Sequence, residues 1–180
     1  TVLMKERYTI MHNKLTVNKL TILLPAVLFL AASLSHAQSE SVAFSVSMEN
    51  PNNHYYHVDM VYNGPAGSVV NFKLPSWAPG YYLVLDYAKN ITGFKAETET
   101  GNPMKWKKSS KNSWQVETGG AKSIHISYDV YAFRVSVAEP FLDDGRAFIA
   151  NNGVLMYVEG KLNLPCTVTI IPYRNFSTIS

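Results

Sequence analysis

Residues 123–132 read SIHISYDVYA, and this stretch determines the predicted fold class. Apolar and polar side chains alternate through it with a period of two residues. Because successive side chains of an extended chain point to opposite faces, the alternation predicts a β-strand with one face buried and the other in solvent. The buried positions of this predicted strand are Ile124, Ile126, Tyr128, Val130 and Ala132.

Shorter β-prone segments lie on both sides of this strand. Residues 57–62 and 68–74 flank the sequence Asn-Gly-Pro-Ala-Gly, whose glycines allow the chain reversal of a hairpin. Only residues 84–90 favour a short helical turn. The other predicted strands are residues 41–48, 105–106, 113–117, 133–137, 147–150, 154–158 and 161–171. Eight or more short strands predict an all-β fold, an antiparallel β-sandwich, because a parallel sheet would need crossover helices that the sequence does not show.

The composition fits a single domain. The chain has 180 residues, 47% of them hydrophobic and 12% aromatic, which is enough for one buried core. Four basic residues and one acidic residue precede Gln38, which leaves 12 of each sign in the rest of the chain. The formal net charge of +3 therefore comes from the N-terminal segment. A β domain without net charge is not suited to bind nucleic acid or an anionic membrane surface.

The N-terminal segment has the pattern of a targeting signal. Residues 20–34 form an apolar run, preceded by Lys14 and Lys19 and followed by Ser-His-Ala. A basic flank, a short apolar run and small residues predict a secretory signal peptide that is cleaved between Ala37 and Gln38. The run of 15 residues is shorter than the ~20 that a membrane-spanning helix needs.

The predicted signal peptide divides the chain into two parts. Residues 1–37 comprise upstream residues and the signal peptide, and residues 38–180 form the β domain. We expect a secreted or periplasmic protein with no stable membrane span after cleavage. Because the sequence begins with Thr1 and not Met, we also expect it to be a fragment.

No catalytic or metal-binding motif is recognisable. The sequence lacks His-Glu-x-x-His, the string that places two zinc-binding imidazoles on one face of a helix. His54 and His57 are three residues apart, so on an extended chain they point to opposite faces. Cys166 is the only cysteine, and its strand-like surroundings predict a small core residue. We therefore predict no catalytic residue, no metal ligand and no cofactor in this chain.

The most distinctive segment is residues 74–91, LPSWAPGYYLVLDYAKNI. It resembles the signature of the N-terminal domain of the glycyl aminopeptidase family of zinc peptidases, metallopeptidase family sixty-one. Further matches follow in the family's order, and the resemblance runs from about residue 42 to the end of the chain. The signature positions are Leu74, Pro75, Trp77, Pro79, Gly80, Tyr82 and Asp86.

The resemblance implies an accessory role. In the resembling enzymes the β domain precedes a helical catalytic domain with His-Glu-x-x-His, and that domain is not contained in these 180 residues. The zinc is expected in the missing catalytic domain, which would also be the partner of this chain and would bind the peptide substrate. The chain alone is expected to be inactive. Asn152, Gly153 and Tyr157 are candidates to reach the substrate cleft, and a purely structural turn is the alternative reading of these residues.

The sequence is also compatible with other functions. The aromatic side chains of Trp77, Tyr81, Tyr82 and Tyr87 also suit a carbohydrate-binding β-sandwich, in which aromatic rings stack on sugars. A stand-alone protein-interaction module is a third reading. Pro75 and Pro79 restrict the backbone around Trp77, so this side chain has a defined direction, either onto the edge of the core or toward a neighbouring domain.

Overall fold

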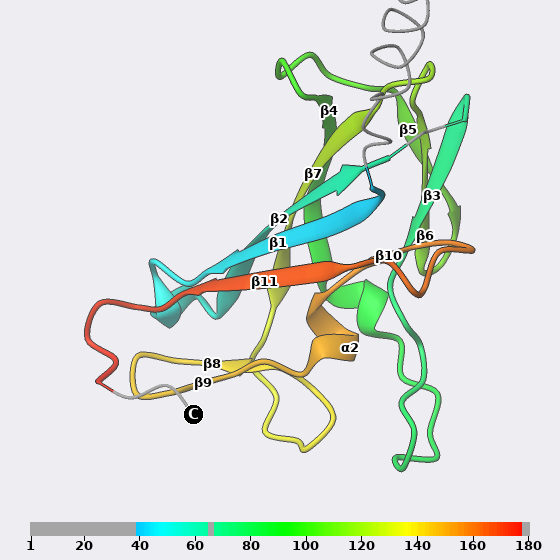
Figure 1. The fold of residues 1–180 in the computed structure, drawn as a ribbon. Helices are drawn as coiled ribbons and strands as arrows, with labels where there is room; N and C mark the ends of the chain where they lie inside the picture. The colour runs from blue at the N-terminus through cyan, green and yellow to red at the C-terminus, as the bar shows by residue number, and fades with distance from the viewer. Residues whose placement is uncertain (1–38, 65–66, 178–180) are drawn as a thin grey trace, which may run out of the picture. The chain divides into compact units, whose positions relative to one another are not determined.

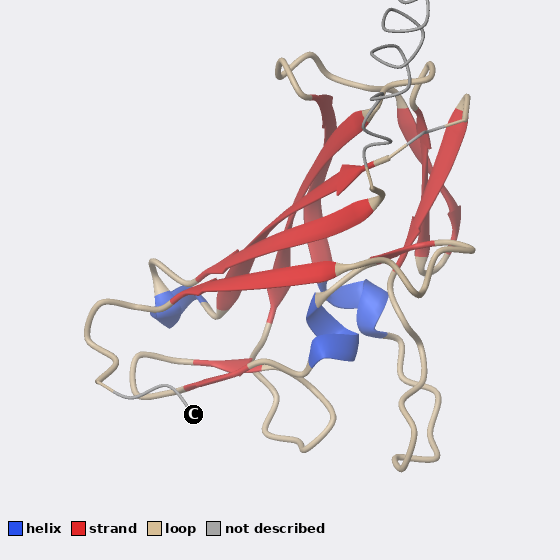
Figure 2. Ribbon diagram, viewed as in Figure 1, coloured by secondary structure: helices blue, strands red, loops and turns tan. Residues whose placement is uncertain are grey.

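A computed structural model describes residues 39–64 and 67–177 of the chain. The signal peptide over 1–37 and the cleavage site between Ala37 and Gln38 lie outside the described residues and stay predictions. No helix in the described residues combines the length and the apolar character needed to cross a bilayer. The described chain is nearly all β, with short helical turns between strands (Figure 2).

The larger of the sheets has five strands in the order β11-β1-β2-β7-β4 (Figure 1). Its central strands are β2, Tyr55–Asn63, and β7, Ser123–Tyr131, which contains most of the alternating stretch of residues 123–132. The strands beside them are β1, Ser41–Ser47; β4, Ile91–Thr98; and β11, Cys166–Ile171. Ile126 of β7 lies opposite Met60 of β2 and Ala96 of β4, so three buried side chains form one row across the sheet.

A second sheet of four strands has the order β10-β3-β6-β5. Its strands are β3, Val69–Lys73; β5, Trp106–Ser110; β6, Ser113–Glu117; and β10, Tyr157–Val158. A separate hairpin pairs β8, Phe141–Leu142, with β9, Ala147–Phe148. The helical turns are η1, Pro51–Asn53; η2, Tyr87–Asn90; and α2, Asn151–Val154. The turn η2 confirms the predicted helical turn over the last four residues of 84–90, whereas η1 and α2 were not predicted.

The two larger sheets share one hydrophobic core. Every second residue of β1, β2 and β7 is buried, and these side chains belong to the same cluster as Phe72 and Trp114 of the second sheet. Phe94 of β4 stacks on Trp114 with 5.5 Å between ring centroids, so the two sheets are in direct aromatic contact. The all-β prediction is confirmed, and both sheets contribute to a single buried core.

One strand pair differs from the prediction. β11 lies parallel to β1, with Val42 opposite Cys166 and Ser47 opposite Ile171, whereas the other ladders are antiparallel. An antiparallel arrangement is required only of strands joined by a short turn. Because β1 and β11 are far apart in sequence, local turn signals could not define their direction.

Further predictions were wrong. β2 and β3 lie in different sheets, so the hairpin predicted for residues 57–62 and 68–74 does not form, and the turn between them connects the two sheets. Residues 133–137 form a loop in place of a strand, with only an isolated bridge from Phe133 to Phe141. The segment 154–158 is divided between α2 and β10, and the segment 161–171 becomes a strand only at Cys166. Cys166 is exposed and not in the core, because both faces of β11 are exposed along its first four residues. Sequence alternation alone cannot reveal whether a neighbouring strand is present to complete the pairing.

Candidate functional site

The signature segment forms a long loop between β3 and η2. Leu74 begins it and is fully buried, and Asn112 fixes its backbone, because Asn112 Nδ2 donates to Leu74 O at 2.7 Å and Leu74 N donates to Asn112 O at 3.0 Å. Leu85 N donates to Ser76 O at 2.8 Å and thereby closes the loop on itself. Gly80 has a φ of +88°, a left-handed conformation that suits glycine and sharpens the turn at the tip.

Most side chains of this loop face solvent. Trp77 is 50% exposed and Tyr82 is 85% exposed, and Leu83 and Val84 are exposed as well. Trp77 is therefore not part of the core cluster. The reason is the backbone closure between Ser76 and Leu85, which makes the loop a separate projection that does not lie on the sheet (Figure 1).

The loop of residues 133–140 projects from the same end of the domain (Figure 1). Tyr87 of η2 holds it, since the Tyr87 hydroxyl donates to Ala138 O at 2.8 Å. The buried carboxylate of Glu139 pairs with Arg134, with Nε 2.9 Å from Oε2. Val135 and Val137 between them are 77% and 85% exposed. These valines are strand-type residues, but here they form an apolar surface without a partner strand.

Both loops meet α2 at a shallow pocket of about 480 Å³. Asn152 is one of its lining residues. Gly153 is buried below, where a Cβ would lie 2.8 Å from Pro140 Cδ and 3.1 Å from Tyr87 Cδ1. Tyr157 lies on β10 opposite Lys73 and does not line this pocket. The lining residues come from the signature loop, the loop of residues 133–140, β9 and α2, and they are Ala78, Pro79, Gly80, Tyr81, Val137, Ala138, Phe148, Ala150, Asn151 and Asn152.

Tyrosine hydroxyls attach this irregular region to the larger sheet. Tyr56 of β2 donates to Phe141 O and Tyr128 of β7 donates to Val154 O, both at 2.8 Å. Burial raises the pKa of Tyr56 and of Tyr128 above the ordinary value of tyrosine, and it raises the pKa of Tyr87 as well. Each phenol therefore stays neutral and keeps its donor proton, which the backbone carbonyl needs.

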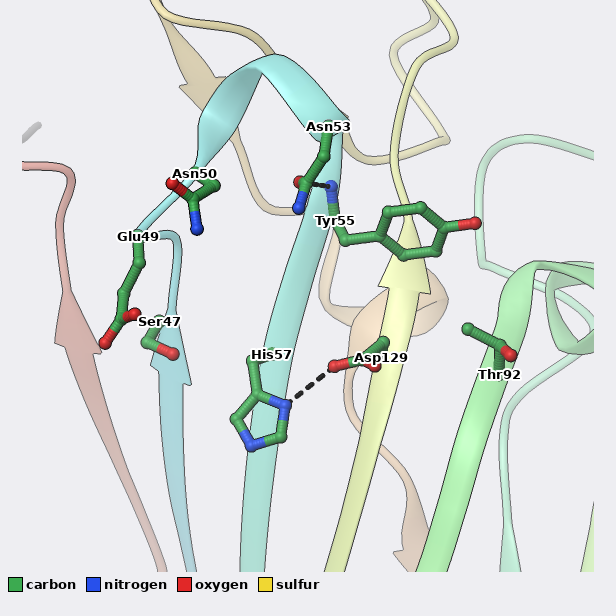
Figure 3. A pocket seen from close by; sticks show the side chains of 8 residues that line it. All are labelled: Ser47, Glu49, Asn50, Asn53, Tyr55, His57, Thr92 and Asp129. Atoms are coloured by element: carbon green, nitrogen blue, oxygen red, sulfur yellow. Dashed lines mark hydrogen bonds and ion pairs between the residues drawn. The ribbon is translucent and has the colours of Figure 1, made fainter.

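A second pocket, of about 340 Å³, lies beside the η1 turn (Figure 3). Its base contains His57 of β2 and Asp129 of β7, which face each other in the register and are joined by a 2.7 Å contact from His57 Nδ1 to Asp129 Oδ1. The remaining lining residues are Ser47, Glu49, Asn50, Asn53, Tyr55 and Thr92. Sequence analysis missed this pocket, because its residues come from several separate segments and form no motif.

The imidazole–carboxylate contacts continue along the outer face of the sheet. His57 Nε2 lies 3.6 Å from Asp59 Oδ2, and His125 Nε2 lies 2.9 Å from Asp59 Oδ1. His54 points elsewhere, with its Nδ1 2.7 Å from Leu142 O and its ring stacked on Phe133. His54 precedes β2 in a left-handed conformation, so the prediction made for an extended chain does not apply to it. In the described part of the chain, no group of three histidine, cysteine, aspartate or glutamate side chains is arranged to hold a metal ion.

Comparison with known proteins identifies the domain. The family model of the peptidase M61 N-terminal domain matches residues 43–180, which include both loops and both pockets. The chain belongs to this peptidase family. The resemblance that the signature segment carries is thereby confirmed. No curated protein matches the sequence.

Parts of solved structures are similar to the M61 domain. The domain is similar to an aminopeptidase N family protein from Idiomarina loihiensis, with 28% sequence identity and a TM-score of 0.68 over 74% of this chain. The chain spans 22% of the length of that protein, or about a fifth. It also matches an M1 zinc metallopeptidase variant from Deinococcus radiodurans in complex with a Tyr-Ser-Ala substrate, with 9% identity and a TM-score of 0.41, over 76% of this chain and 32% of the other.

The signature residues of the M61 domain differ in burial and in position along the loop. Leu74 is in the core, Pro75 follows it at the start of the loop, and Pro79 and Gly80 form the tip and line the pocket beside Asn152. Tyr82 has a φ of +57° and faces solvent. Asp86 precedes η2 and lies 3.5 Å from Lys111 Nζ. The exposed side chains of Val137 and Phe148 also line the pocket beside Asn152. The strand-like sequence around Val137 did not predict that this residue would line a pocket.

Proposed function

We propose that this chain is the accessory N-terminal β domain of a secreted zinc aminopeptidase, and that it packs against a catalytic domain outside these 180 residues. The zinc and the peptide substrate belong to that catalytic domain in this proposal, and the present chain is inactive alone. Membership of the M61 family and the similarity to a much longer aminopeptidase N family protein support the proposal. Export through the signal peptide over residues 1–37 is part of it, with a secreted or periplasmic location.

The observation that carries the proposal is the apolar loop surface. We give this name to the exposed apolar side chains of the signature loop and of residues 133–137, together with Phe148. Its members are Trp77, Tyr82, Leu83, Val84, Phe133, Val135, Val137 and Phe148. Val137 and Phe148 of this set line one pocket together with the tip of the signature loop, and exposed apolar side chains on neighbouring loops are typical of an interaction surface. A catalytic domain of the same enzyme is the partner that the family membership favours.

The pocket beside this surface suits the edge of a substrate cleft. Asn152 lines it and is only partly buried, so its amide is available to a peptide backbone. Gly153 brings α2 close to Pro140 and thereby sets the position of Asn152. Tyr157 lies on β10 outside the pocket, so Asn152 is the stronger candidate of the three for a cleft contact.

Light scattering tests the docking part of the proposal. The purified chain should associate at rising concentration, because the apolar loop surface is uncovered without the catalytic domain. The double variant Val135→Asp and Val137→Asp should be monomeric, since both side chains face solvent and their replacement leaves the core intact. Leu162→Asp is the matched control, because Leu162 is 76% exposed and lies outside this surface. A wild-type chain that is a compact monomer at all concentrations would contradict the proposal.

Kinetics of a full-length enzyme with this domain test the cleft assignment. Asn152→Ala should weaken cleavage of short peptides with an N-terminal glycine, whereas Leu162→Ala should not. Unchanged kinetics in Asn152→Ala would remove Asn152 from the cleft and leave the docking role unaffected.

A further inference from the structure

The pocket beside η1 is formed at one end of the five-stranded sheet, where four strands and a turn meet. β1 ends at Ser47, β2 begins at Tyr55, β4 begins near Thr92 and β7 ends after Asp129, and the η1 turn closes the rim (Figure 3). Its volume of about 340 Å³ falls within the ~300–1,000 Å³ of small-molecule sites. The lining is polar, which distinguishes this pocket from the apolar loop surface.

Several polar groups of the pocket are open to a ligand. Within residues 39–64 and 67–177, the side chains of Ser47, Glu49, Asn50 and Thr92 have no hydrogen-bond partner. Asn53 Oδ1 accepts a hydrogen bond from Tyr55 N at 2.9 Å, which fixes the side chain and leaves its Nδ2 donor open. Hydroxyl, amide and carboxylate groups thus surround one small volume. Together they can donate to and accept from a ligand that carries many hydroxyl groups.

The base of the pocket is held rigidly. Asp129 Oδ1 is bound to His57 Nδ1, and Asp129 Oδ2 lies 3.2 Å from the position that a Cβ of Gly93 would occupy. Gly93 has a φ of +64° and lies in the irregular pairing of β4 with β7 between Thr92 and Lys95. Glycine is therefore needed both for the backbone and for the close approach of the Asp129 carboxylate. The carboxylate is oriented before any ligand arrives.

An aromatic face borders the polar groups. Tyr55 is 36% exposed and its ring lies beside Asp129 and Thr92 at the pocket (Figure 3). Tyr131 faces Tyr55 in the register, with ring centroids 5.3 Å apart, and is 40% exposed. The face of an aromatic ring carries partial negative charge and attracts the polarised C–H groups on one face of a sugar ring.

The charges restrict the ligand further. Glu49 and Asp129 are carboxylates, and no lysine or arginine lines the pocket. Negatively charged ligands such as phosphates and acidic sugars are repelled by such a site, whereas neutral and amine-bearing ligands are accepted. We propose that this pocket binds a saccharide of the neutral or amino-sugar class, with Tyr55 as the stacking platform and Asn50, Asn53, Glu49 and Asp129 as hydrogen-bonding groups.

This site is separate from the surface proposed for docking. None of its lining residues belongs to the apolar loop surface or to the pocket beside Asn152. It also differs from the aromatic residues of the signature loop, which sequence analysis named for sugar stacking. A saccharide site here would attach the peptidase to glycan-bearing material, and its failure would leave the proposed accessory role intact.

Titration of the full chain with defined oligosaccharides tests the proposal. The panel comprises a neutral glucose oligomer, an N-acetylglucosamine oligomer, a glucosamine oligomer and an acidic galacturonate oligomer, and saturation-transfer NMR and calorimetry report binding. At least one of the first three should bind with a Kd of about 1 mM or tighter, and the acidic oligomer should bind about tenfold more weakly or not at all. Absence of binding by all four, or equal binding of the acidic oligomer, overturns the proposal.

Single-residue substitutions test whether the saccharide binds in the pocket beside η1. Asn50→Ala and Tyr55→Ala should each weaken the affinity about tenfold or more, and Tyr55→Phe should retain most of it because the ring is kept. Asn50 donates and accepts no side-chain hydrogen bond among the described residues, so Asn50→Ala tests the site without disturbing the fold. Tyr82→Ala in the signature loop is the control and should bind as the wild type does. Binding that survives Asn50→Ala and Tyr55→Ala, or is lost in Tyr82→Ala, overturns the assignment to this pocket.

Discussion

The hydroxyl of Tyr128 lies 2.8 Å from the carbonyl oxygen of Val154, and the same hydroxyl accepts a hydrogen bond from Met156 N at 3.2 Å. One phenol in the central strand β7 thus satisfies two backbone groups at the end of α2. All three residues are buried, so no bulk solvent is available to replace these bonds. The position of α2, and with it the position of Asn152, depends on this contact.

Tyr128→Phe should therefore destabilise the domain by about 1–3 kcal/mol, because it leaves a buried carbonyl and a buried amide without their partner. Urea denaturation measures this loss. Tyr131→Phe is the matched control, since Tyr131 is 40% exposed, and its effect should stay within about 0.5 kcal/mol. Equal stability of both variants would contradict the role assigned to the Tyr128 hydroxyl.

The buried tyrosines predict a loss of stability at alkaline pH. Burial raises the folded-state pKa of Tyr56, Tyr87 and Tyr128 above the ordinary value of 10.0. Their contribution to stability is complete below pH 10.0 and is lost as the pH rises from there through the folded-state pKa. The unfolding free energy from urea titrations should fall above that pH, and phenolate absorbance should increase together with unfolding. Ionisation of these tyrosines in a chain that stays folded would disprove the prediction.

Gly153→Ala should destabilise the domain even though alanine favours helices. The gain in helix propensity is about 1 kcal/mol. The added Cβ would lie 2.8 Å from the rigid ring of Pro140, and overpacking of this kind costs about 1–3 kcal/mol. Thermal unfolding should show a lower midpoint. Gly67→Ala is the control, because its nearest contact would be Val69 O at 3.9 Å. A midpoint at or above that of the wild type would show that α2 can shift to accept the methyl group.

Cys166 should react with a maleimide in the native state, because it is exposed on the edge strand β11. Mass spectrometry of the labelled chain measures the reaction, with the denatured chain as the reference for full labelling. Labelling that occurs only after denaturant is added would place Cys166 in a covered position and would contradict the position of β11 at the sheet edge.

The sequence predicted a strand correctly where the alternation of apolar and polar residues matches the burial of the two faces in the fold. The alternation of residues 123–132 predicted the half-buried strand β7 because the strand is paired on both sides and covered on one face. The segment around Val135 and Val137 has comparable β-prone residues, yet it forms a loop because no neighbouring strand is available along most of it. β-propensity becomes a strand only when a partner supplies the other half of the hydrogen bonds.

The sequence also predicted one of the two candidate sites and not the other. The signature loop was found because its residues are contiguous and distinctive, and the family model that matches residues 43–180 agrees with it. The polar pocket was not found, since Ser47, Asn53, Thr92 and Asp129 become neighbours only through sheet pairing. The exposure of Trp77 likewise depends on a backbone closure between Ser76 and Leu85 that its flanking prolines do not reveal.

The pairing of β11 with β1 has a consequence for the order of folding on the ribosome. β1 and β2 emerge early and can form their hairpin at once, but the free edge of β1 has to wait for more than a hundred further residues before Cys166 and Ile171 are made. Contacts so distant in sequence form late, and an unprotected edge in the meantime invites pairing with other nascent chains. Completion of the sheet is thus tied to the synthesis of residues 166–171, and a ribosome that stalls before residue 166 leaves a domain whose β1 edge is unpaired.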